Sequence, residues 1–190
     1  MSEAYFLTTH SALLFAFSHA DRDHGNAAAA ERQIATFAVD RYERSPPSPR
    51  NLGSPENQAH LAGQILGIVA NNTRPAFQVL CEARFAKLNT PRQDAACYRL
   101  ARLIGADMPA TVGLPAVARL MRGCTGRAIN VADLAEQAGV TRMTANRWRI
   151  IVQRFVRQIE APGMATIEPL FERAEIVRSS SMLDDVTNRW

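Results

Sequence analysis

Apolar residues recur along most of the chain every three or four positions, which is the spacing of one helix face rather than the alternation of a strand. Serine, threonine, asparagine and proline precede several of these stretches, where they suit an N-cap or a first helical turn. The pattern predicts an all-α fold with a helical N-terminal and middle region and a C-terminal trihelical unit. The expected helices cover residues 3–19, 27–43, 55–71, 76–88, 90–104, 115–121, 131–138, 142–160 and 165–177.

One segment interrupts this helical pattern. Ser45 to Pro55 holds four prolines and a glycine, so it suits neither a helix interior nor a central strand. It is interpreted as a linker, with an extended arm laid over another surface as the alternative. The predicted organisation is a helical hairpin (1–44), a linker (45–55), a central helical region (56–105), a DNA-binding domain (114–160) and a C-terminal helix and tail (161–190).

The stretch from Val131 to Phe155 fits a helix-turn-helix. Ala135 is small enough for two helices to cross closely, and Gly139 can end the first helix in a left-handed conformation. Thr141 then suits the N-cap of the second helix. The alternative is an ordinary αα-hairpin in a helical core, since such pairs with glycine in the turn are common.

In a helix-turn-helix, the start and outer face of the second helix enter the major groove. Arginine matches the acceptor edge of guanine, and asparagine matches adenine. The preceding helix, 115–121, is expected to end at Gly123 and to cover the core of the pair, with Arg119 and Arg122 reaching phosphates or water. The predicted DNA-binding residues are Thr141, Arg142, Met143, Asn146, Arg147, Arg149, Arg127 and Arg122.

The charge distribution agrees with this interpretation. The whole chain carries a net charge of +4, but residues 119–157 hold eight arginines against two acidic residues, a larger local surplus. A basic block over such a motif is the expected electrostatic footprint of a DNA-binding protein. Arginine makes up all the basic residues except Lys87. That bias suits phosphate binding, but the base composition of a GC-rich genome explains most of it.

Other function classes find little support. The chain has no P-loop, GxGxxG or GxSxG motif and no paired carboxylates at a predicted site, so we expect neither an enzyme nor a cofactor. Cys81, Cys97 and Cys124 lack metal-ligand spacing and suit a reducing cytoplasm. The histidines and aspartates of residues 19–24 favour a solvated loop over a metal site. No signal peptide or membrane span is predicted, which indicates a cytoplasmic protein.

The order of these parts resembles a family of phage and prophage regulators. An apolar N-terminal helix (THSALLFAF) is followed by ENQAHLAGQILGIV, by a helix ending in ARFA (Ala83 to Ala86), and by the C-terminal motif. This layout resembles late-gene regulators of the antiterminator Q type, whose C-terminal module is similar to the promoter-reading region 4 of sigma factors. The resemblance implies action in a bacterial host and contact of the N-terminal part with RNA polymerase or a second copy. It also implies DNA reading by Thr141, Arg142, Met143, Asn146 and Arg147.

The sequence therefore predicts a DNA-binding transcription regulator without catalytic activity, whose partners are double-stranded DNA and RNA polymerase, with a homodimer as a further expectation. The alternative is a helical phage assembly or packaging protein similar to a small terminase subunit, or a protein that binds a host factor. Terminase-type subunits carry their helix-turn-helix nearer the N-terminus and assemble into rings.

Overall fold

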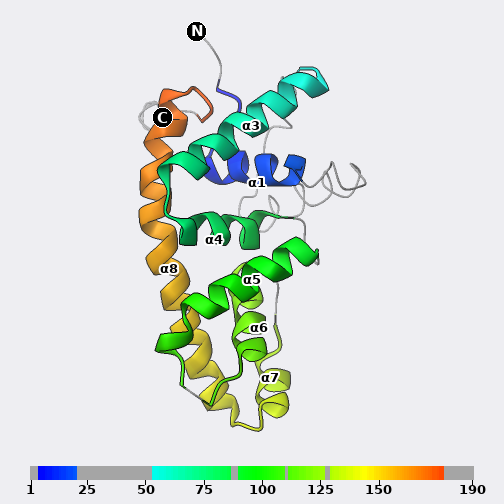
Figure 1. The fold of residues 1–190 in the computed structure, drawn as a ribbon, viewed down its shortest axis with the longest axis vertical. Coiled ribbons are helices and arrows are strands. Elements are labelled where there is room, and N and C mark those ends of the chain that lie inside the picture. The colour runs from blue at the N-terminus through cyan, green and yellow to red at the C-terminus, as the bar shows by residue number, and fades with distance from the viewer. Residues whose placement is uncertain (1–3, 21–52, 87–89, 110, 127–128, 178–190) are drawn as a thin grey trace, which may run out of the picture. The chain divides into compact units, whose positions relative to one another are not determined.

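The computed structural model describes residues 4–20, 53–86, 90–109, 111–126 and 129–177 of the chain (Figure 1). Within these residues the predicted all-α fold is confirmed, because the chain forms seven α-helices and no strand. The predicted helix 27–43, residues 45–52 of the linker and the C-terminal tail lie outside the described residues. The helices are α1 (Thr9–Ala20), α3 (Pro55–Asn72), α4 (Pro75–Phe85), α5 (Pro91–Leu103), α6 (Leu114–Cys124), α7 (Val131–Gln137) and α8 (Arg142–Arg173), with a 3-10 turn at Gly105–Asp107.

Capping residues set where the helices begin. The side chain of Ser54 accepts a hydrogen bond from the backbone of Asn57 at 3.4 Å, and Thr90 accepts one from Gln93 at 3.3 Å. Each is followed by a proline in the first helical turn, where its missing N–H costs nothing. These local signals explain why the starts of α3 and α5 could be placed from the sequence.

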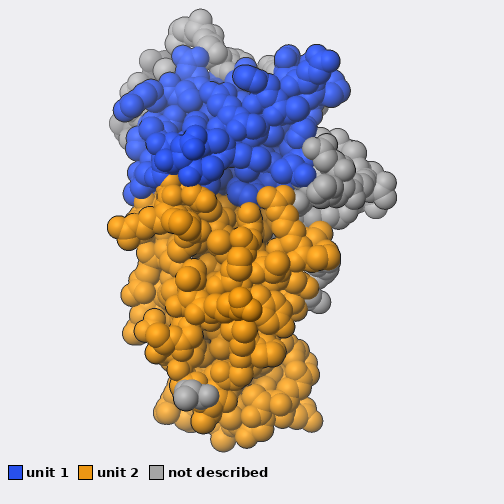
Figure 2. All heavy atoms as spheres, viewed as in Figure 1, with its two compact units in different colours: residues 1–72, 164–190 blue, residues 73–163 orange. Residues whose placement is uncertain are grey.

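The described chain divides into two compact units, shown in different colours in Figure 2. Unit 1 comprises residues 1–72 and 164–190, and unit 2 comprises residues 73–163. The last turns of α8 therefore group with the N-terminal helices, whereas its first part groups with α4 to α7. The domain boundaries expected from the sequence stay a prediction.

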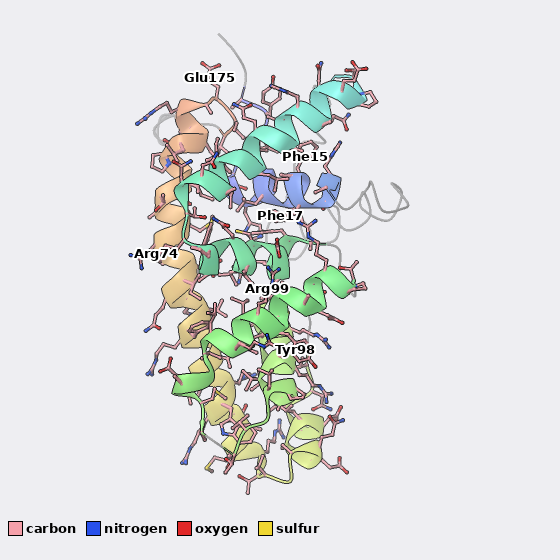
Figure 3. All side chains as sticks on the ribbon, viewed as in Figure 1. Phe15, Phe17, Arg74, Tyr98, Arg99 and Glu175 are labelled. Atoms are coloured by element: carbon pink, nitrogen blue, oxygen red, sulfur yellow. The ribbon has the colours of Figure 1, made fainter. Side chains whose placement is uncertain are left out.

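In unit 1, α1 packs against α3. The expected helix start at residue 3 is wrong, because Thr8 and Ser11 cap α1 reciprocally: each side-chain oxygen accepts the other residue's backbone N–H, at 3.1 and 3.3 Å. Phe6 before the cap is extended. Its N–H donates to the carbonyl of Ile176 at 2.9 Å, and its ring lies 5.2 Å from that of Phe15, which Figure 3 labels on α1. Phe6 thereby ties the N-terminal segment to the residues that follow α8.

In unit 2, α5 packs against both α4 and α6. Buried Gln93 on α5 donates from its side chain to the carbonyl of Ala83 on α4 at 3.1 Å, which satisfies a polar group inside the core. At the surface, Glu82 on α4 pairs with Arg99 and Arg92 on α5. Figure 3 labels Arg99 and Tyr98 on α5.

Helix α8 is longer than the sequence pattern predicted. The expected division into two helices, 142–160 and 165–177, is wrong, since one helix continues through Pro162 and Gly163 to Arg173. An interior proline removes one backbone hydrogen bond and costs about 3 kcal/mol. Beyond it, Ile167 and Phe171 are both fully buried. Burying each such side chain contributes about 1.5–3 kcal/mol, enough to offset the proline.

Gly163 permits the close packing of α8 on α4. A Cβ built at Gly163 would overlap the ring of Phe77, which is itself only 3% exposed and cannot move aside. The neighbouring proline and glycine therefore have opposite surroundings: Pro162 faces solvent, and Gly163 lies against an aromatic ring.

Both α7 and α8 end in the same way. After α8, the N–H of Ile176 bonds to the carbonyl of Phe171 at 2.9 Å, and that of Glu175 bonds to Glu172 at 3.0 Å. This is a Schellman motif, which needs a left-handed residue where Glu175 has φ +56°. After α7, Gly139 fills the same position with φ +63°. Glu175, labelled in Figure 3, therefore adopts a backbone conformation that glycine adopts at lower cost.

The first prediction concerns Gly163. Gly163→Ala should lower the free energy of unfolding by about 1–3 kcal/mol, because the added methyl group overpacks against Phe77. Gly63→Ala is the matched control. A Cβ at Gly63 in the interior of α3 would meet nothing within 4 Å, so this change should raise stability by about 0.5–1 kcal/mol. Urea unfolding curves of both variants measure the two effects, and equal effects would contradict the packing argument.

The second prediction concerns the ends of α7 and α8. Glu175→Gly should raise the free energy of unfolding by about 0.5–1 kcal/mol, since relief of the left-handed strain exceeds the entropy that glycine adds to the unfolded chain. Gly139→Ala, at the equivalent position after α7, should lower it by about 1 kcal/mol. Thermal melts followed by circular dichroism provide the test. Destabilisation by Glu175→Gly would show that the glutamate side chain is needed.

Candidate nucleic-acid interface

Helices α7 and α8 are joined by a tight turn, and hydrogen bonds fix the backbone at both ends of α7. Asn130 caps α7, because its side chain accepts from the N–H of Ala132 at 3.0 Å. At the other end, the N–H of Gly139 bonds to Glu136 at 3.1 Å and that of Val140 bonds to Ala135 at 2.9 Å. This is the glycine-ended form of the Schellman motif, so the predicted role of Gly139 in ending the helix is confirmed.

A small apolar cluster holds the pair together. Val131 and Ala135 of α7 are buried with Ala145 of α8, and Val140 packs against them from the turn. Ala145 is fully buried and Ala135 is 4% exposed, so the two helices approach through residues without long side chains. The expectation that Ala135 lies at a close approach of the two helices agrees with this arrangement.

Thr141 caps α8 as the sequence predicted. Its hydroxyl oxygen accepts from the backbone N–H of Thr144 at 3.2 Å, and the two hydroxyl groups lie 3.0 Å apart. The cap fixes the direction in which α8 leaves the turn. Since an N-cap leaves other N–H groups of the first turn without helical partners, this end of α8 also favours anionic groups.

The leading end of α8 presents most of the predicted contact residues to solvent. Thr141, Arg142, Arg147 and Arg149 are exposed, and Asn146 is half-buried. Met143 is 66% exposed, although a methionine normally favours the interior. Its sulfur lies 3.9 Å from a guanidinium nitrogen of Arg147. The opposite face, with Ala145 and Trp148, is buried. One helix face thus holds the fold while the other is available for contact.

The two arginines of α6 form contacts with neighbouring helices. Arg122 forms an ion pair with Asp94 of α5 at 2.9 Å, and its Nε is buried without a hydrogen-bond partner in the described part of the chain. Arg119 donates to the side chain of Gln137 on α7. Both arginines therefore connect helices. DNA contact by Arg122 stays a prediction, and Arg127 lies outside the described residues.

Helix α6 itself continues past the expected end at Gly123 to Cys124. Gly123 is needed for space rather than for a turn, since a Cβ there would lie 2.7 Å from the side chain of Ile129. The backbone turns instead at Gly126, whose φ is +130°.

Sequence reasoning missed part of the exposed face of α8. Ile150 is 52% exposed although its side chain is apolar. Arg154 and Arg157 are exposed on the same part of the helix and were not among the predicted contact residues. Counting turns onward from Met143 could have found them, because residues three and four apart share a helix face.

Two of the three cysteines, Cys81 and Cys97, are buried in the described structure, and Cys124 is half-buried. Burial raises the pKa of Cys81 to about 12 and that of Cys124 to about 11, and it also raises the pKa of Cys97. The described residues contain no group of three or more His, Cys, Asp or Glu side chains placed to hold a metal ion. None of the described helices is long and apolar enough to cross a membrane.

Comparison of the chain with protein-family models, with curated proteins and with solved structures finds no match.

The third prediction concerns the thiols. The thiolate is the reactive form, so raised pKa values keep all three cysteines protonated and slow to react at pH 8. An alkylating reagent should modify them slowly in the native protein and rapidly in denaturant, as counted by mass spectrometry. Stability should be unaffected by these groups below about pH 8.5 and should fall above it, because the unfolded thiols then ionise while the buried ones do not. Rapid labelling of Cys81 in the native protein would contradict its burial.

Proposed function

We propose that this chain is a sequence-specific DNA-binding transcription regulator of phage type, in which α7 and α8 form a helix-turn-helix. The observation that carries the proposal is the combination at one place of a Schellman turn at Gly139 and an arginine-rich, solvent-exposed start of α8. An ordinary αα-hairpin needs the turn and the apolar cluster, but it does not need Arg142, Met143 and Arg147 on the outer face.

The exposed side chains have the chemistry for reading base edges. Arg142 and Arg147 can donate to guanine, and the amide of Asn146 matches adenine. Met143 offers apolar contact for a thymine methyl group. Arg149 is placed to bind phosphate, and the capped start of α8 adds backbone N–H groups that attract the same anion.

Helix α6 supplies the third helix of the proposed unit. The bond from Arg119 to Gln137 links α6 to α7, and the pair of Arg122 with Asp94 links α6 to α5. We assign these two arginines a positioning role, since a guanidinium held by a partner has fewer donors to offer to DNA. The remaining helices are then the region through which the regulator would contact RNA polymerase or a second copy.

Tyr98 and Leu103 on α5 are 38% and 54% exposed, but they are five residues apart and lie on different sides of the helix, so they do not form one contact surface. A packaging protein is the alternative function. The mass of the protein in solution distinguishes the two functions, because a monomer or dimer fits a regulator and a large ring fits a packaging protein.

The fourth prediction tests DNA reading directly. Arg142→Ala with Arg147→Ala should weaken binding to a site selected from random DNA by about 30-fold or more, because each base-contacting arginine is worth about 1–3 kcal/mol. Arg102→Ala with Arg173→Ala is the matched control, since it removes the same charge from exposed positions outside the proposed interface. Fluorescence anisotropy at constant salt measures both.

Two outcomes would contradict the assignment. If no sequence is enriched from the random pool, site-specific regulation is excluded. If both double variants lose affinity equally, the effect comes from net charge, and base reading by Arg142 and Arg147 is excluded.

A further inference from the structure

The exposed face of α8 continues well beyond the residues assigned to base reading. Met143, Arg147, Ile150 and Arg154 follow one another at intervals of four, three and four residues, and Arg157 follows three residues later. This spacing places them on one side of the helix. At a rise of about 1.5 Å per residue, the row from Met143 to Arg157 is about 21 Å long. These five residues are called the α8 stripe.

The fold does not explain the α8 stripe. Its residues are all exposed, with Met143 at 66% and Ile150 at 52%, whereas the opposite face of α8 carries the buried Trp148 and Val152. Among the described residues, no ion pair is formed by Arg147, Arg154 or Arg157. The helix carries no acidic residue before Glu160 that could neutralise them. The α8 stripe is therefore a cationic surface with two apolar side chains among the arginines.

The length of the α8 stripe can be compared with the width of a DNA groove. The major groove of B-DNA is about 12 Å wide and is bordered by one phosphate row on each strand. Contacts confined to the first two turns of α8 would end near Arg149. Arg154 and Arg157 lie about 10 and 15 Å further along the axis than Arg147, which is the scale of the distance to the opposite phosphate row.

We propose that α8 contacts double-stranded DNA along the whole α8 stripe, so that Arg154 and Arg157 bind phosphates at the far border of the groove. Ile150 then lies at the groove floor, where its apolar side chain contacts the methyl group of a thymine. This inference rests on the proposed function and extends it: it adds two phosphate contacts and one specificity residue to the helix. The occupant is DNA because phosphate rows match a row of unpaired arginines.

The fifth prediction measures the phosphate contacts through salt dependence. Each phosphate contact contributes about 0.9 to the slope of log affinity against log salt. Arg154→Ala with Arg157→Ala should therefore reduce that slope by about 2, while the preference for the selected site over random DNA is kept. Arg154→Lys with Arg157→Lys should restore most of the slope, because lysine also binds phosphate as a point charge. Arg102→Ala with Arg173→Ala again serves as the charge-matched control.

Ile150 is tested by removing the methyl group from the DNA rather than the side chain from the protein. Replacing thymines of the selected site by uracil one at a time should reveal one position where the wild-type protein loses about four-fold in affinity, the value of one buried methyl group. Ile150→Ala should bind the thymine and uracil forms of that position equally.

The outcomes separate this inference from the function on which it rests. If the wild-type protein binds no DNA, both are overturned. If it binds a specific site but the alanine pair keeps the wild-type slope, or the lysine pair fails to restore it, DNA reading stands and the extended contact is overturned. A uracil effect that persists unchanged in Ile150→Ala overturns the role of Ile150. An acidic protein that binds the α8 stripe while DNA does not would assign this surface to a protein partner.

Discussion

The burial of one face of α8 is the interaction on which unit 2 depends. Ala145, Trp148, Val152 and Val156 are 0–4% exposed, and they recur every three or four residues along the helix. Gly163 completes this row, because only a residue without a Cβ admits the ring of Phe77. The rotation of α8 about its axis is thereby fixed, since any other rotation would expose these apolar residues or bury arginines.

The same constraint determines what α8 shows to solvent. A helix whose buried face is fixed has an exposed face that is equally fixed, so the packing of the opposite face holds Arg147, Ile150 and Arg154 in a row. The turn at Gly139 and the Thr141 cap fix the point where this row begins. The proposed DNA contact therefore requires no ordering of the helix on binding, which lowers the entropy cost of association.

Local signals explain what could be predicted from the sequence. Ser54, Thr90 and Thr141 place helix starts because a cap acts within three residues, and Gly139 ends a helix through its own backbone angle. Contacts between distant residues explain what could not be predicted. Pro162 by itself predicts the end of a helix. The helix continues because Ile167 and Phe171 beyond it are buried, which the local sequence does not show.

The candidate site shows the same division. Exposure of Arg142, Met143 and Arg147 follows from the helical period and was predicted correctly. The partners of Arg119 and Arg122 lie on other helices, so no local pattern distinguishes them from arginines that face solvent. On α5, Leu100 is fully buried but Leu103 is 54% exposed, so the buried face of this helix is narrower than the spacing of its apolar residues suggests.

The uninterrupted course of α8 also gives the helix an uneven distribution of charge. Its first part carries five arginines before Glu160, whereas the remainder carries Glu160, Glu168 and Glu172 against Arg173 alone. The backbone dipole has the same sense, positive at the N-terminal end. The field of a polyanion would therefore orient the protein before contact, with the arginine-bearing end of α8 toward the polyanion. The consequence lies in the kinetics of encounter, where a larger share of collisions is productive and the association rate depends on ionic strength.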